Sequence, residues 1–135
     1  MNAEELYQQA LALRRKGEYR QAAELYRQAA EQGHADAQNE LGVAYAKGQG
    51  VPKDDAQAVF WYQKAAGQGD PYACSNLGFR YKNGTGIQKD AAEAARWFRK
   101  SAEQGIAKAQ YELGLAYDAG RGVKKDPVHA ASWYR

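Results

Sequence analysis

The chain has few of the residues that carry redox, metal or membrane functions: its 135 residues include one cysteine and two histidines. A single cysteine, Cys74, excludes an internal disulfide, so we expect a reducing, cytoplasmic location. His34, Cys74 and His129 do not have the spacing of a zinc site, and we expect neither a metal nor a cofactor. No apolar run approaches the roughly 20 residues that span a bilayer, and the opening MNAEELYQQALALRR has no apolar signal core, so neither membrane insertion nor export is expected.

The chain also lacks a cluster of one charge. Its 19 basic and 16 acidic side chains are mixed along the sequence and leave a formal charge of +3. Proteins that bind DNA or RNA concentrate Lys and Arg in one stripe. The densest basic run here, residues 14–16, stands at a predicted helix end, where cations interact favourably with the helix dipole. Nucleic acid is therefore not an expected partner.

What the sequence does contain is a repeat of 36 residues, which decides the architecture. Segments 35–70, 71–106 and 107–135 align with one another, and the shorter segment 3–34 aligns in part. The aligned sets include Leu41, Leu77 and Leu113, Gly42, Gly78 and Gly114, Tyr45, Tyr81 and Tyr117, and Trp61, Trp97 and Trp133. A single repeat cannot bury its aromatic face alone, so the repeats are expected to stack. The predicted fold class is all-α, a solenoid of stacked antiparallel helix hairpins that forms one domain over residues 1–135.

Each full repeat carries a pair of glycines, in KGQGVPKD, NGTGIQKD and AGRGVKKD. A phosphate-binding loop follows a strand and opens onto free helix N-terminal amides, whereas here a helix precedes the loop and an Asp follows it. The glycines are instead predicted to end the first helix in left-handed conformation. Asp54, Asp90 and Asp126 are predicted to cap the second helices, with Gln57 and Glu93 completing capping boxes.

Two other repeated features are assigned to packing. The glycines inside the first helices, such as Gly78, each lose about 1 kcal/mol of helix propensity relative to Ala, so they are predicted to allow a close approach between helices. The three tryptophans recur beside small residues on the second helices, and we predict that they lie in the core and are not platforms for base stacking.

The segments LGVAYAKGQGVPKD, LGFRYKNGTGIQKD and LGLAYDAGRGVKKD resemble Sel1-like repeats, which are relatives of the tetratricopeptide repeat. Residues 3–34 lack the double glycine and resemble a tetratricopeptide unit that would cap the stack. The resemblance implies a right-handed superhelix whose first helices line a concave face. It also implies a non-enzymatic scaffold that binds a peptide or protein partner in a bacterial cytoplasm. Some secreted relatives staple each hairpin with a cysteine pair, which this chain lacks.

The resemblance further implies which residues face the concave groove. Apolar anchors with scattered polar groups suit a peptide or a partner helix. The predicted groove residues are Leu11, Asn39, Val43, Tyr72, Ser75, Phe79, Lys82, Lys108, Tyr111 and Leu115. The open alternative is that this row packs against the neighbouring repeat.

Two other functions stay open. Asp126, His129 and Ser132 follow one another on a predicted helix and resemble the residue set of a hydrolase, which would make the chain a weak enzyme or an accessory domain. The repeat alignment assigns all three to scaffold positions, so an enzyme is not expected. The sequence ends at Arg135 within an expected helix, which leaves a structural unit that associates end to end through residues 127–135 as the third candidate.

Overall fold

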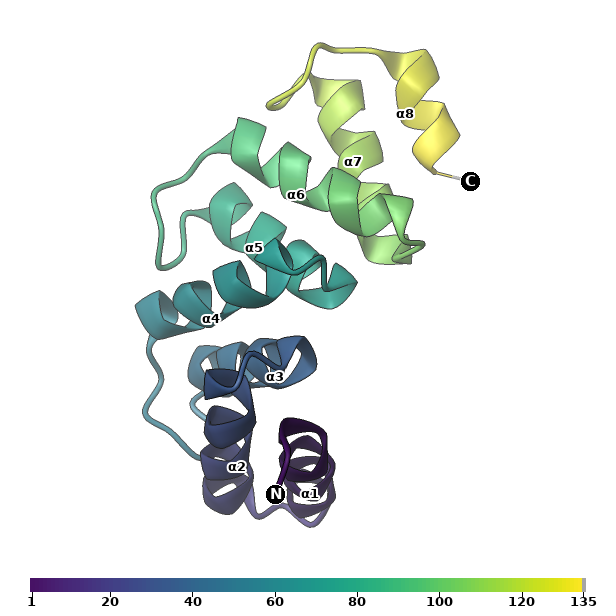
Figure 1. Cartoon of the computed structure of the whole chain (residues 1–135). Helices are drawn as coiled ribbons and strands as arrows, with labels where there is room; N and C mark the ends of the chain where they lie inside the picture. The colour runs from purple at the N-terminus through teal and green to yellow at the C-terminus, as the bar shows by residue number, and fades with distance from the viewer. Residues whose placement is uncertain (135) are drawn as a thin grey trace. The chain divides into compact units, whose positions relative to one another are not determined.

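The computed structural model describes residues 1–134. Within these residues the regular secondary structure is entirely helical, with no strand, as the sequence predicts. The helices are α1 (Ala3–Arg15), α2 (Tyr19–Glu31), α3 (Ala35–Lys47), α4 (Asp55–Gly67), α5 (Pro71–Asn83), α6 (Ala91–Glu103), α7 (Ala107–Ala119) and α8 (Pro127–Trp133) (Figure 1). No helix in this part of the chain is both long and apolar enough to cross a bilayer. The chain divides into two compact units, one formed by Met1–Gln68 and one that starts at Gly69.

The first unit consists of two helix hairpins, α1 with α2 and α3 with α4, and α2 also packs on α3. Its core is formed by the faces that the hairpins turn toward one another. Leu6, Tyr26, Leu41 and Tyr62 are all buried there, together with a series of alanines. The prediction of antiparallel helix hairpins holds for this unit.

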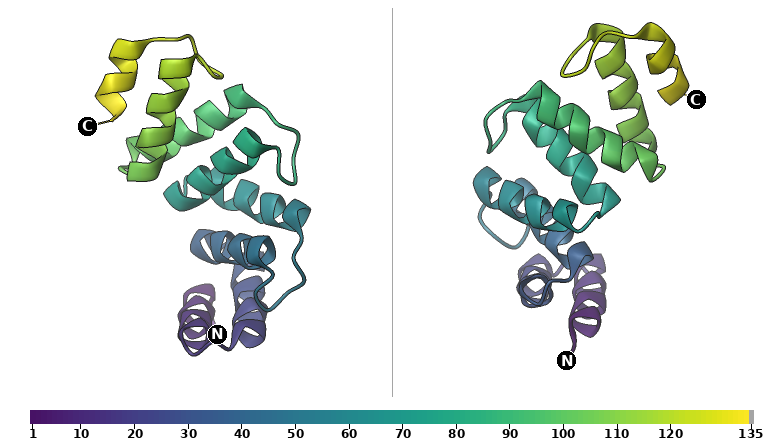
Figure 2. Two further views of the ribbon diagram at one scale, coloured as in Figure 1. Left: turned by 180° about the vertical axis from the view of Figure 1, so that it is seen from behind. Right: turned by 45° about the horizontal axis from the view of Figure 1, so that its top comes forward.

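The second unit repeats the arrangement with α5 and α6 as one hairpin and α7 and α8 as the other, and α6 packs on α7. Figure 2 shows the members of each hairpin side by side in both views. The core cluster combines Phe98 of α6 with Leu113 and Tyr117 of α7, and small alanines fill the space between them. Phe79 and Trp133 pack against this cluster from its edge.

The glycine pairs are turns, as predicted. Gly48, Gly84 and Gly120 end α3, α5 and α7 in left-handed conformation, each with φ of 68°. The backbone N–H of each glycine donates to the carbonyl four residues earlier, which satisfies one of the carbonyls left open at a helix end. The loops therefore serve to reverse the chain between two helices.

The second helices begin at the predicted caps, but the predicted capping boxes do not form. A side-chain oxygen of Asp54 accepts from the Gln57 N–H at 3.1 Å, and Asp90 accepts from the Glu93 N–H at the same distance. A capping box also needs the side chain of Gln57 or Glu93 to accept the backbone N–H of the cap residue, and this second bond does not form in α4 or α6. The N–H of each cap instead donates at 3.0 Å to a tyrosine carbonyl of the preceding helix, at Tyr45 and Tyr81. This bond ties the end of the loop to the helix before it.

The glycines inside the first helices confirm the predicted close approach. A Cβ added to Gly42 would lie 2.7 Å from the ring of Tyr62, and one added to Gly78 would lie 2.7 Å from the ring of Phe98. Real Cβ atoms do not come so near another heavy atom. The aromatic ring of the second helix therefore rests on bare backbone of the first.

The tryptophans follow the core prediction only in part. Trp61 is buried, whereas Trp97 and Trp133 are half-buried and Trp133 packs against the core cluster from its edge, so the core prediction holds in full only for Trp61. The charged ends of Arg96 and Lys100 each lie 4.7 Å from the Trp97 ring. Trp97 thus has charged side chains over its ring, as long Lys and Arg stems commonly cover aromatic surface.

Candidate partner-binding site

Each predicted groove residue of the first unit lies on α1 or α3. Leu11 and Val43 are half-buried, while Asn39 has only 7% of its surface exposed. The burial follows from the wide buried face of α3, which also takes in Gln38 and Leu41 on either side of Asn39. The prediction that Asn39 lines an open groove is therefore wrong for this conformation.

The predicted residues of the second unit separate into a buried one and an exposed set. Ser75 has no exposed surface, because α5 buries both Cys74 and Leu77 beside it, and its place in a groove is also a wrong prediction. Tyr72 and Tyr111 are 59% and 55% exposed and stand out from α5 and α7. Two large aromatic side chains are thus available on neighbouring first helices.

Phe79 connects the core to this exposed set. Its ring meets the Phe98 ring edge-on, with the centroids 4.9 Å apart. Lys82 Nζ and Lys108 Nζ lie 5.8 Å and 5.7 Å from the Phe79 centroid, within reach of cation–π attraction. Phe79 thus packs in part on the second helix of its own repeat, while the two lysines keep their charges near the surface.

An ion pair joins α5 and α7, the helices that carry Tyr72 and Tyr111. Lys82 Nζ on α5 lies 2.7 Å from Glu112 Oε2 on α7. Arg14 on α1 and Glu40 on α3 form the corresponding pair in the first unit. Burial raises the pKa of the Glu40 carboxyl, and the positive charge of Arg14 offsets only part of this effect. These pairs cross-link first helices of successive hairpins, so each charge is satisfied before a ligand arrives.

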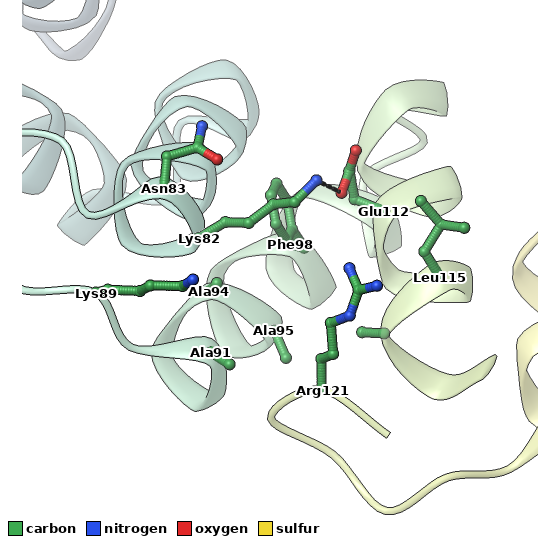
Figure 3. Close-up of a pocket in the computed structure, with 11 residues that line it drawn as sticks. Lys82, Asn83, Lys89, Ala91, Ala94, Ala95, Phe98, Glu112, Leu115 and Arg121 are labelled. Carbon is green, nitrogen blue, oxygen red and sulfur yellow. Dashed lines mark hydrogen bonds and ion pairs between the residues drawn. The ribbon is translucent and has the colours of Figure 1, made fainter. Parts of the chain in front are cut away.

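A cavity of about 280 Å³ opens beside the Lys82–Glu112 pair, between α5, α6 and α7 (Figure 3). Small and apolar side chains of α6 and α7 form one part of its lining, and charged side chains form the other. The lining residues are Lys82, Asn83, Lys89, Ala91, Ala94, Ala95, Phe98, Glu112, Leu115, Ala116 and Arg121. Of these, the groove prediction included Lys82 and Leu115 and missed Lys89 and Arg121, which come from loops.

The candidate hydrolase residues do not assemble into a triad. Asp126 accepts the backbone N–H of His129 at 3.1 Å, and the Ser132 hydroxyl donates to the backbone carbonyl of His129 at 2.6 Å. The imidazole ring itself stacks on Tyr117, with ring centroids 4.0 Å apart. A triad requires the serine hydroxyl to face the imidazole nitrogen, whereas here it faces backbone.

The remaining reactive groups have structural partners. His34 caps α3 by accepting the Ala37 N–H at 3.1 Å, and its other ring nitrogen lies 2.6 Å from Glu4 Oε2. Cys74 is buried, and burial raises the pKa of its thiol, which keeps it in the unreactive neutral form. Within residues 1–134, no three His, Cys, Asp or Glu side chains gather in a way that would hold a metal ion.

The comparison with protein families decides the identity of the fold. The Sel1 repeat model matches residues 3–34, 35–70, 71–106 and 107–135. The chain belongs to the Sel1 repeat family. The match includes residues 3–34, for which the sequence predicted a tetratricopeptide-like cap. Sel1 repeats generally serve as protein-interaction scaffolds and are typically not catalytic.

Solved bacterial structures share this Sel1 fold. A Sel1 repeat protein from Oxalobacter formigenes is 45% identical with a TM-score of 0.81, over 85% of this chain and 47% of its own. The protective antigen c5321 of uropathogenic Escherichia coli, described as having an SLR fold, is 43% identical with a TM-score of 0.85, over 99% of this chain and 32% of its own. Cysteine rich protein B of Helicobacter pylori is 30% identical with a TM-score of 0.62, over 65% of this chain and 66% of its own.

The chain spans less than half the length of the first two of these Sel1 structures. A search among curated proteins finds no match. The solved structures confirm the prediction of an all-α helical-repeat fold, and they leave the partner to be derived from the surface of this chain.

Proposed function

We propose that this Sel1 repeat chain is a non-enzymatic scaffold that binds a peptide or a protein segment through its second unit. The binding surface is the aromatic face, which we define as Tyr72, Phe79, Lys108 and Tyr111 on α5 and α7. The observation that carries the proposal is the exposure of both tyrosines, 59% and 55%, on helices already joined by the Lys82–Glu112 pair.

The composition of the aromatic face suits protein recognition. Tyrosine is enriched among the residues that dominate binding energy, because its ring offers a large rigid contact and its hydroxyl a hydrogen bond. Lys108 adds a charge at the margin, where a polar group sets orientation at little cost in desolvation. The helix backbone beneath is held by the Phe79–Phe98 contact, so the face is formed before a partner binds.

Quantitative capture from bacterial lysate tests the proposal when wild type is compared with Tyr72→Ala/Tyr111→Ala. Both side chains are exposed, so the double variant should keep its helical circular dichroism. Phe79→Ala is a poorer choice, since it also removes a ring that packs against Phe98. The matched control is Phe60→Ala, which removes an aromatic side chain with 46% exposure from α4 of the first unit.

We expect proteins that wild type and Phe60→Ala both retain to be lost from the double variant. If the same proteins remain bound to all three, the aromatic face is not the binding surface. Truncating a central interface tyrosine costs about 2 kcal/mol or more, which is a loss of roughly 30-fold in affinity and easily seen in capture.

We also propose that the chain acts in the cytoplasm, an assignment supported by its single, buried thiol. End-to-end association remains a separate prediction. Light scattering that gives a monomer at high concentration would contradict it.

A further inference from the structure

The first repeat lacks an aromatic pair that the other three repeats share. Each of the repeats 35–70, 71–106 and 107–135 has a tyrosine in its first helix and a tryptophan in its second helix. The pairs are Tyr45 with Trp61, Tyr81 with Trp97, and Tyr117 with Trp133. The first repeat has Leu13 and Leu25 at the equivalent positions. Two aromatic rings are thus replaced there by smaller, aliphatic side chains.

An opening of about 540 Å³ lies at these two leucines, and we call it the α2 opening. Its apolar part is formed by Leu13 of α1, Leu25 of α2 and Val51 of the loop that follows α3, and all three are half-buried. Arg20, Glu24 and Arg27 of α2 also line it and supply its charges. Pockets that hold small ligands span roughly 300 to 1,000 Å³, so the α2 opening has room for a large side chain.

The backbone beside the α2 opening follows the same course as in the second unit. A Cβ added to Gly50 would lie 2.1 Å from the carbonyl oxygen of Tyr19, and one added to Gly122 would lie 2.1 Å from that of Ala91. In both units the loop is therefore seated in the same way on the start of the preceding second helix. The opening follows from the side chains of the first unit, and Trp97 shows which side chain the same backbone carries at the position of Leu25.

The charges of the α2 opening include a free cation. The Arg20 side chain is exposed and makes no hydrogen bond or ion pair with any residue in the described range 1–134. Arg27 is already engaged, because its guanidinium donates to the Tyr45 hydroxyl and lies 5.7 Å from the Tyr45 ring. Glu24 is exposed, and its carboxylate is an acceptor. The opening thus offers one uncommitted guanidinium and one carboxylate beside an apolar floor.

The chemistry that complements this arrangement is that of an aromatic ring with a polar edge. A cation is attracted to the face of an aromatic ring, and most strongly to that of tryptophan. The second unit gives an example of the attraction, because the charged ends of Arg96 and Lys100 each lie 4.7 Å from the Trp97 ring. A tryptophan also carries an indole N–H that needs an acceptor when its ring is buried. An aliphatic side chain would cover the floor and leave Arg20 without a complement.

We propose that the α2 opening binds a tryptophan side chain of a partner protein, with the indole on the three apolar side chains and one ring face toward Arg20. The indole N–H donates to Glu24. The bound tryptophan takes the place in the first repeat that a tryptophan of the chain itself takes in each of the other three. This site lies in the first unit and is independent of the aromatic face.

Binding of blocked tripeptides tests the inference, with two-dimensional NMR of the labelled full chain as the readout. The probes are Gly-Trp-Gly, Gly-Phe-Gly and Gly-Leu-Gly, each acetylated and amidated so that no terminal charge contributes. We expect the Trp probe to shift the amide signals of Leu25 and Val51 in a saturable titration. It should bind about fivefold more tightly than the Leu probe, the factor that corresponds to one cation–π contact. The Phe probe should be weaker than the Trp probe, because it has no N–H for Glu24.

Two variants copy residues of the second unit into the first. Leu25→Trp should fill the α2 opening and abolish binding of the Trp probe. Gln28→Trp is the matched control, because it adds the same side chain one helical turn further on, at an exposed residue that does not line the opening. Arg20→Ala, which copies Ala92, should remove the preference for the Trp probe over the Leu probe. Circular dichroism checks that all three variants are folded.

Four results would overturn parts of the proposal. Binding that survives Leu25→Trp, or the absence of shifts with any probe, would overturn the α2 opening as the site. Equal affinity for the Trp probe and either of the others would overturn the assignment to tryptophan, and an unchanged preference in Arg20→Ala would overturn the role of the cation. Shifts of the same signals when the free protein is concentrated would assign the opening to a second copy of the chain. The proposed function fails separately, when partner capture does not respond to loss of Tyr72 and Tyr111.

Discussion

The contact between Gly78 and Phe98 gives the most stringent test of the packing. In Gly78→Ala, the new Cβ would lie 2.7 Å from one ring carbon of Phe98 and 2.8 Å from the next. Phe98 is 2% exposed, belongs to the core cluster and packs edge-on against the Phe79 ring, so its ring cannot shift away from α5 without disturbing that packing. The methyl group must therefore push apart the α5–α6 hairpin.

The magnitude follows from two opposing effects. Replacing Gly by Ala in the middle of a helix gains about 1 kcal/mol of helix propensity. Forcing an extra methyl group into a packed core costs roughly 1 to 3 kcal/mol. Gly78→Ala should accordingly lose about 0 to 2 kcal/mol of unfolding free energy, although an unconstrained helix would gain from the same change.

Gly114 provides the matched comparison. A Cβ there would lie 2.7 Å from Cδ1 of Tyr134, but Tyr134 is 41% exposed and can turn away toward solvent. The turn would break its hydrogen bond to Asp118, which is 2.6 Å long and exposed. The propensity gain and this loss are each about 1 kcal/mol, so Gly114→Ala should be close to neutral.

Urea denaturation followed by circular dichroism measures the difference. We expect Gly78→Ala to be less stable than Gly114→Ala by up to about 2 kcal/mol. Equal stabilisation by both substitutions would refute the reasoning, because it would mean that the Phe98 ring does not rest on the backbone of α5.

Three further predictions concern single side chains. Tyr26→Phe should stabilise the protein by about 1 kcal/mol, because the buried Tyr26 hydroxyl has no hydrogen-bond partner within residues 1–134, and the equivalent residue, Phe98, has no hydroxyl. Burial raises the pKa of Tyr26 to about 12 from 10, so the wild type should lose stability as pH rises from 10 to 12, and the variant should lose less over that interval. Asp90→Ala should cost about 1 kcal/mol in urea denaturation, because the N–H of residue 93 loses its acceptor. Gly84→Ala should cost about 1 to 2 kcal/mol in the same assay, because Ala must adopt a φ of 68°; a neutral result at either position would contradict its assigned role.

The helices and their ends could be predicted from the sequence because their signals are local. A glycine with positive φ and an Asp that accepts the N–H three residues later act within one turn of chain, so Gly48 and Asp54 reveal their roles by residue type alone. The capping boxes failed because the competing acceptor, the carbonyl of Tyr45, comes from the previous helix. A contact of that kind is fixed by how the loop folds back and has no local signal.

The surface was harder to predict, because exposure depends on how much of each first helix its neighbours cover. Tyr72 and Tyr111 emerged as exposed, while Asn39 and Ser75 did not, although all four were assigned to the same face. The sequence does contain a signal for the cavity. Alignment of α2 with α6 places Ala91 where the first unit has Tyr19, so the second unit has a much smaller side chain at this position. The size of the cavity could not be inferred, because the space left by a small side chain depends on the separation of α6 and α7.

Site-specific photo-crosslinking tests the central claim, partner binding at the aromatic face of the second unit, most directly. A photoreactive phenylalanine analogue at position 111 should form a covalent adduct with the partner in lysate, and the same analogue at position 60 of the first unit should not. Adducts formed at position 60 and absent at position 111 would contradict the account.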